Sequence, residues 1–228
     1  EPSARPFNED VVAGRNLEAF AAAGFFVSRD GWLITSAKAL SLDQQTHELE
    51  PGYVIKIITE AGIFSVSDSI HLNEDESIAA VKVAGDFHPL PLSDSDEIAE
   101  GAPMFAVSLD SPSRGNFVPQ ILKGTVNHAG EGRRNEPIFT VNTTEIAASL
   151  SNFMVFNPLG QATGFAFPPE HPGATELAAV KINDIKNFLR DNIPDITLEE
   201  SQAQREPSEV ALMDHARQGT AMVVVYRN

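Results

Sequence analysis

Short runs of apolar or alternating apolar and polar residues dominate the chain from residue 24 to about residue 170. The runs are rich in β-branched and aromatic side chains, as in WLITSA (residues 32–37), YVIKIIT (53–59) and PMFAVSL (103–109). Turn residues separate them at intervals of about 8–12 positions, and such spacing is typical of an all-β sandwich or barrel. Asp30-Gly31 and Leu159-Gly160 stand where tight hairpins need a residue that tolerates positive φ.

Composition narrows the possible functions. The chain has 228 residues, 42% of them hydrophobic, which suits one large domain or two small ones. With 16 Lys and Arg against 32 Asp and Glu, its net charge of −16 disfavours binding to nucleic acids and anionic lipids. No apolar run approaches the ~18 residues that would cross a bilayer. The absence of cysteine excludes disulfides, thiolate metal sites and a cysteine nucleophile.

The two ends of the chain differ from the middle. We expect residues 1–20 to form an N-terminal arm and residues 21–192 to form the β-domain, which closes with a helix before Pro194. Residues 193–228 are interpreted as a polar linker and a strand-like tail. The tail contains AMVVVY (residues 221–226), which needs the edge of a sheet to pair with.

Three segments resemble, in order and spacing, the trypsin-like serine peptidases, and most closely their HtrA (DegP-like) branch. Residues 24–40 are similar to the strand–turn–strand that delivers the catalytic histidine of that family. Residues 77–95 are similar to the segment that carries the catalytic aspartate, and residues 149–164 to the segment around the nucleophilic serine. The resemblance implies two six-stranded antiparallel β-barrels packed face to face, with the functional cleft between them and a C-terminal helix around residues 182–192.

On this alignment the catalytic triad is degenerate. The histidine position holds Lys38, the aspartate position holds Ser77, and only Ser151 matches the family. A serine hydroxyl becomes a nucleophile only when a base accepts its proton, and a lysine with a reference pKa near 10.4 is a cation at neutral pH. Ser77 has no charge that would stabilise an imidazolium. We therefore assign no catalytic residue among Lys38, Ser77 and Ser151.

The loop that forms the oxyanion hole in the family is also altered. Ser149 replaces the glycine two residues before the nucleophile, and Asn152 and Phe153 replace the two glycines after it. Losing one donor of an oxyanion hole costs about 100–1,000-fold in rate. Phe153 has two open interpretations. Its side chain either protrudes into the former substrate cleft or packs within an ordinary rearranged loop.

Together these features indicate a pseudopeptidase, a catalytically inactive homologue that acts as a binding or scaffolding module. One alternative is an active serine endopeptidase in which Ser151 uses a rearranged base, either Lys38 or a nearby histidine such as His71. Another is a metal- or small-ligand-binding protein. The chain has six histidines, and none has the i, i+4 spacing of helical metal ligands. They are His47, His71, His88, His128, His171 and His215. We predict no metal site and no cofactor.

The expected ligand is a peptide or protein, held in the cleft between the barrels or at a barrel edge by strand addition. We expect no nucleic-acid partner and no membrane span, and the strand-like tail suggests self-association. The family resemblance implies a periplasmic, cell-envelope or secreted protein. The side chains of Phe25, Phe26 and Trp32 alternate within strand patterns, so we expect them in a core.

Overall fold

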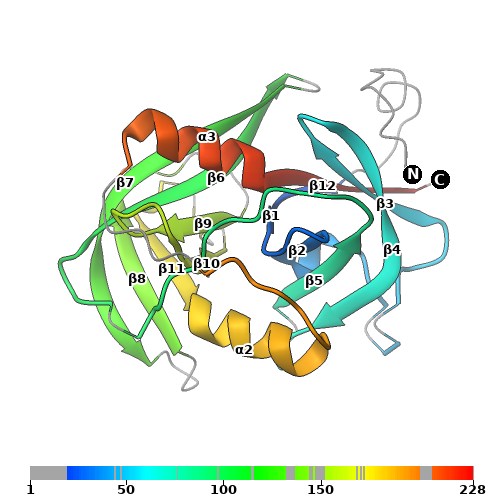
Figure 1. The fold of residues 1–228 in the computed structure, drawn as a ribbon, viewed down its shortest axis with the longest axis horizontal. Helices are drawn as coiled ribbons and strands as arrows, with labels where there is room; N and C mark the ends of the chain where they lie inside the picture. The colour runs from blue at the N-terminus through cyan, green and yellow to red at the C-terminus, as the bar shows by residue number, and fades with distance from the viewer. Residues whose placement is uncertain are drawn as a thin grey trace.

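The computed structural model describes residues 20–43, 45–46, 48–75, 77–96, 98–113, 116–131, 137–143, 146, 152–167, 169, 171, 173–200 and 207–227. Over these residues, antiparallel strands close into two six-stranded barrels that stand side by side (Figure 1). The prediction of two six-stranded antiparallel barrels with a C-terminal helix is confirmed. No helix among the described residues is long and apolar enough to span a membrane.

Barrel 1 contains five strands from the first half of the chain and one from its end. These are β1 (Phe20–Phe26), β2 (Trp32–Ser36), β3 (Tyr53–Thr59), β4 (Gly62–Leu72), β5 (Ile78–Val83) and β12 (Thr220–Arg227). Barrel 2 contains six consecutive strands. They are β6 (Pro103–Ser113), β7 (Asn116–Glu131), β8 (Pro137–Thr143), β9 (Phe153–Phe156), β10 (Ala162–Ala166) and β11 (Glu176–Lys181).

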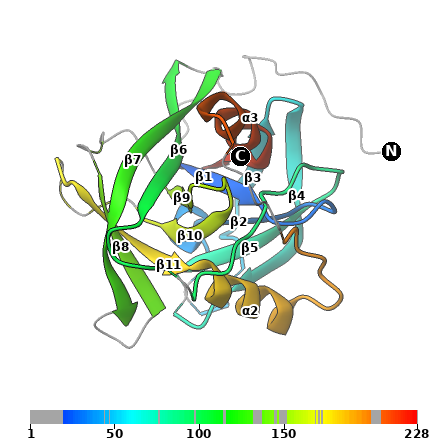
Figure 2. The ribbon, with the colours of Figure 1, turned by 60° about the vertical axis from the view of Figure 1, so that its left-hand side comes forward.

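Helices lie on both sides of the interface between the barrels (Figures 1 and 2). Helix α2 (Ile182–Asn192) follows β11 directly, in the range where the resemblance implies a closing helix. Helix α3 (Glu209–Gly219) leads into β12, and the sequence pattern did not indicate it. A single 3-10 turn, η1 (Ala37–Ala39), follows β2.

Strand alternation divides the buried side chains into three clusters. One fills barrel 1 and includes Phe26, which stacks on Phe87 with ring centroids 4.1 Å apart. A second fills barrel 2. The third joins the barrels with α2 and α3, and contains Phe25 and Trp32. The side chains of Phe25, Phe26 and Trp32 are thus all buried in one of the clusters, as the sequence predicts.

The predicted turn between β1 and β2 is present. Gly31 adopts a φ of +94°, and a Cβ placed on it would come within 1.9 Å of the carbonyl oxygen of Val83. Only glycine fits this position, because both the backbone angle and the space exclude a side chain. The turn thereby packs against the end of β5, the strand that begins directly after Ser77.

Candidate functional site

Barrel 1 brings the first two triad positions next to each other. Lys38 lies in η1, directly after β2, and Ser77 lies directly before β5. The backbone N–H of Ala37 donates a hydrogen bond to the carbonyl oxygen of Ser77, with a distance of 3.0 Å. The local backbone thus has the adjacency that a histidine–aspartate pair requires. Ser149 and Ser151 lie outside the described residues, so the structure does not test the position of the nucleophile.

The Lys38 side chain is exposed to solvent. A lysine serves as a general base only where burial strips water from its amine and disfavours the charged form. The exposed side chain of Lys38 does not have that burial among the described residues. An exposed lysine amine is suited to hold an anion by charge attraction.

Ser77 is committed to its own loop. Its hydroxyl donates to Oδ1 of Asp75 at 2.6 Å, and its backbone N–H donates to Oδ1 of Asn73 at 2.9 Å. The Nδ2 of Asn73 donates in turn to the Ser77 hydroxyl at 3.3 Å. These hydrogen bonds close a polar turn at the start of β5. The carboxylate of Asp75 accepts a hydrogen bond within this turn. Ser77 therefore acts here as a turn residue.

Asn152 links the two barrels. Its side chain is only 2% exposed, and its Nδ2 donates to the carbonyl oxygen of Ala23 on β1 at 3.0 Å, with a longer contact of 3.5 Å to Oγ1 of Thr35 on β2. The Thr35 hydroxyl donates to the same Ala23 carbonyl at 3.0 Å. A glycine at position 152 would make none of these contacts. The residue that follows Ser151 is therefore anchored to barrel 1 by a satisfied, buried amide.

Phe153 is fully buried and begins β9, where it pairs with Ala166 of β10. Its side chain belongs to the cluster inside barrel 2. The structure thus has neither a Phe153 that protrudes into a cleft nor one packed in a loop, because the residue begins a strand and its side chain lies in the core of barrel 2. Its neighbour Met154 faces the other way, into the cluster between the barrels, as alternation along a strand requires.

His71, the first alternative base, is half-buried on β4 and contacts Trp32, with ring centroids 5.6 Å apart. Trp32 begins β2, whereas Lys38 follows the other end of that strand, and a strand rises about 3.3 Å per residue. Nζ of Lys82 lies 5.0 Å from the centre of the Trp32 ring and also pairs with Asp30. In register, His71 lies opposite Ala80 of β5, which pairs with Ile34 in the middle of β2, so the imidazole packs on an aromatic ring and its place relative to Ser151 is not tested.

Metal ligands do not gather in the part of the chain that the structure describes. No group of three or more His, Asp or Glu side chains there could hold a metal ion. His47 lies outside the described residues, and His128 pairs at the surface with Glu100 at 3.2 Å. The described residues offer no support for the alternative of a metal-binding protein.

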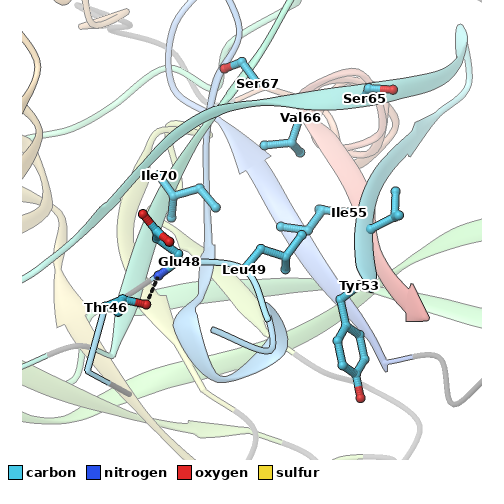
Figure 3. A pocket seen from close by; sticks show the side chains of 10 residues that line it. Thr46, Glu48, Leu49, Tyr53, Ile55, Ser65, Val66, Ser67 and Ile70 are labelled. Atoms are coloured by element: carbon cyan, nitrogen blue, oxygen red, sulfur yellow. Dashed lines mark hydrogen bonds between the residues drawn. The ribbon is translucent and has the colours of Figure 1, made fainter. Parts of the chain in front are cut away.

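A cavity of about 540 Å³ opens on barrel 1, and the sequence analysis did not foresee it (Figure 3). Its lining combines apolar side chains with hydroxyl groups and one carboxylate. The residues are Thr46, Glu48, Leu49, Tyr53, Val54, Ile55, Ser65, Val66, Ser67 and Ile70. No local signal in the sequence predicts the cavity, because serines that alternate with apolar residues are ordinary in an antiparallel strand with one side facing solvent.

The cavity exists because β3 and β4 separate. Their pairing runs from Thr59 and Gly62 only as far as Lys56 and Ser65. Beyond that point β4 pairs with β5, and its register shifts between Val66 and Ile70. The two strand edges therefore diverge, and Thr46, Glu48 and Leu49 border the opening between them. Leu49, Val66 and Ile70 also pack on the barrel 1 cluster.

Comparison with known proteins gives one family and one fold. A family model described as the trypsin-like peptidase domain matches residues 22–165, more than half of the chain. Among solved structures, a structure titled "Crystal structure of Deg5" is similar with a TM-score of 0.56 and 15% sequence identity. The match covers 83% of this chain and 95% of that one. A search of curated proteins finds no match.

Proposed function

Because the chain belongs to the trypsin-like peptidase family, we propose that it is a catalytically inactive, HtrA-type member that binds peptides or proteins. The observation that carries the proposal is the state of the two triad positions in barrel 1. Lys38 is exposed, and the Ser77 hydroxyl donates to Asp75. Neither residue performs the work of the histidine or the aspartate in the family mechanism.

The altered oxyanion loop supports the same proposal. In an active enzyme, backbone amides of this loop must point at the oxyanion. Here the amide side chain of Asn152 is bound to β1, and Phe153 is packed inside barrel 2. Both side chains hold the residues after position 151 by contacts to the barrels. Glycines at positions 152 and 153 would lack these contacts.

The proposed ligand is an extended peptide, and the cavity between β3 and β4 supports this choice. An extended segment that enters such a gap finds backbone edges on both sides for strand addition. Leu49, Ile55 and Val66 offer an apolar surface to one of its side chains, while Glu48 and the net charge of −16 favour a basic partner. By family resemblance, we place the protein in the cell envelope or outside the cell.

Labelling with a fluorophosphonate probe, read by intact mass, tests the loss of catalysis. We expect no labelling of the wild type, because no base activates Ser151. Ser151→Ala is the control, and circular dichroism must show that both proteins are folded. Stoichiometric labelling of the wild type that disappears in Ser151→Ala would establish an active serine endopeptidase and overturn the proposal.

Peptide binding is tested with a pool of fluorescent peptides in which one apolar residue is flanked by lysines, using fluorescence anisotropy. Ser65 lines the cavity and is exposed, so Ser65→Trp should narrow the mouth without touching a core. We expect it to weaken binding at least tenfold. Ser69→Trp is the matched control, on an exposed residue of the same strand outside the cavity. Equal binding by wild type and both variants would exclude this cavity as the peptide site.

A further inference from the structure

The order of strands around the barrels reveals an unusual position for β12. Followed around barrel 2 from its first strand, the order is β6, β7, β8, β11, β10, β9. The same path around barrel 1 is β12, β1, β2, β5, β4, β3. The two barrels thus repeat one topology, and β12 holds the place that β6 holds in barrel 2. The last strand of the described chain fills the position of a first strand.

Strand β12 is bound on both of its edges. It pairs with β1 from Phe20 and Val225 to Phe25 and Thr220, and with β3 from Met222 and Ile58 to Arg227 and Tyr53. Its side chains serve two clusters, with Val223 inside barrel 1 and Val224 between the barrels. Without β12, barrel 1 would be an open sheet with two unpaired edges and an exposed core, so this slot needs an occupant.

Helix α3 docks together with β12. Leu212 and Ala216 are buried in the cluster between the barrels, and Arg217 pairs with Glu60 at 3.0 Å on the β3–β4 turn. The Thr220 hydroxyl donates to the carbonyl oxygen of Ala216, which fixes the helix to the strand. Residues 207–227 are therefore a unit, here named the C-terminal segment, which docks through buried contacts inside barrel 1 and between the two barrels.

The connection to the rest of the chain is short. Two contacts hold the chain just before the connection. The backbone N–H of Leu92 donates to the carbonyl oxygen of Glu199 at 2.7 Å, and Glu200 forms an ion pair with Arg190 of α2. Residues 201–206 then lead to the C-terminal segment, and six extended residues span about 20 Å.

We propose that the slot between β1 and β3 also accepts the C-terminal segment of a second copy of this chain, so that two copies exchange these segments reciprocally. Every contact that holds the segment is the same whichever copy supplies it, and such exchange is therefore a low-cost route to a dimer. The connector between Glu200 and the C-terminal segment is only six residues long, and a short hinge favours exchange over closure within one chain. This inference goes beyond the proposed function and does not depend on the loss of catalysis.

Mixing of two isotopic forms tests the exchange in the full chain. Unlabelled and ¹⁵N-labelled protein are combined at equal, high concentration, held in mild denaturant, returned to buffer and measured by native mass spectrometry. Random exchange predicts that about half of the dimers have the mixed mass. If only monomers are found at every concentration, the proposal is wrong.

Two single-cysteine variants separate segment exchange from ordinary surface association. Ala22 and Val223 are register partners across β1 and β12, they are 6% and 0% exposed, and the chain has no cysteine. Antiparallel partners lie about 5 Å apart at Cα, which suits a disulfide. In a mixture of Ala22→Cys and Val223→Cys chains, exchange predicts a covalent heterodimer.

Ala22→Cys mixed with Ala221→Cys is the matched control, because Ala221 pairs with Gly24 and lies two residues out of register. The double variant Ala22→Cys/Val223→Cys, oxidised within one chain, shows that the substitutions permit folding and that the geometry permits the bond. Mixed-mass dimers that never form the Ala22→Cys to Val223→Cys disulfide would show surface association and overturn the proposal.

Discussion

Asn152 shows how one side chain decides the geometry around a former active site. Its Nδ2 faces the carbonyl oxygen of Ala23, so the position requires a hydrogen-bond donor. Asn152→Asp keeps the shape but turns a carboxylate toward that carbonyl, and we expect a loss of about 2–4 kcal/mol in unfolding free energy at pH 7. Asn152→Leu only removes the hydrogen bond and should lose about 1–2 kcal/mol. Urea unfolding measures both.

The two variants provide the check on this account. If Asn152→Asp is no less stable than Asn152→Leu, the donor is not what matters at this position. Lowering the pH should also restore part of the stability of Asn152→Asp, because a protonated carboxyl can donate to the Ala23 carbonyl. Neither variant is expected to gain peptidase activity.

The sequence predicted the conformation of single residues only where neighbouring residues in the chain determine it. Gly31 was assigned correctly, because a tight turn imposes its own backbone angle. The direction of Phe153 stayed open, since it depends on where β9 begins and on which face meets barrel 2. The partner of Asn152 lies 129 positions away in the chain, and no local rule reports such a contact.

The contribution of the turn between β1 and β2 to the free energy of unfolding should depend on pH. Partial burial raises the pKa of Asp30, but hydrogen bonds from Lys82 and Ser28 outweigh it and hold that pKa below its usual value. A lowered carboxyl pKa contributes stability above the unfolded value, near 3.9, and the contribution is lost as pH falls through the folded value. Because Asp30 is largely exposed, the effect should be about 0.5 kcal/mol.

Asp30→Asn tests this element. We expect the variant to be less stable than the wild type at pH 7 by that small amount, and the difference to shrink below about pH 3. Urea unfolding at both pH values is the measurement, and Asp86→Asn is a control on another acidic residue that is exposed. A difference that is equal at both pH values would show that the Asp30 charge is not responsible.

Elements differ in how far the sequence predicts them. The barrel strands follow from alternation and turn residues, and the strand character of residues 221–226 follows in the same way. Helix α3 was missed because it buries few side chains, chiefly Leu212 and Ala216, while Val210 is 71% exposed. A stripe that narrow does not produce a clear helical period. The separation of β3 from β4 was missed because register is set between strands.

At the scale of the whole molecule, the two barrels receive their last strands at different stages of synthesis. All six strands of barrel 2 are consecutive, so it has every part it needs once Lys181 has been synthesised. Barrel 1 has five of its strands by Val83 but must wait for β12. At ~5–20 residues per second, the 144 residues from Val83 to Arg227 take about 7–30 s.

During that interval the edges of β1 and β3 stay unpaired in the nascent chain, where another strand could add to them. A chain cut short before β12 would keep these open edges, so closure of barrel 1 depends on a strand that is made long after its other five.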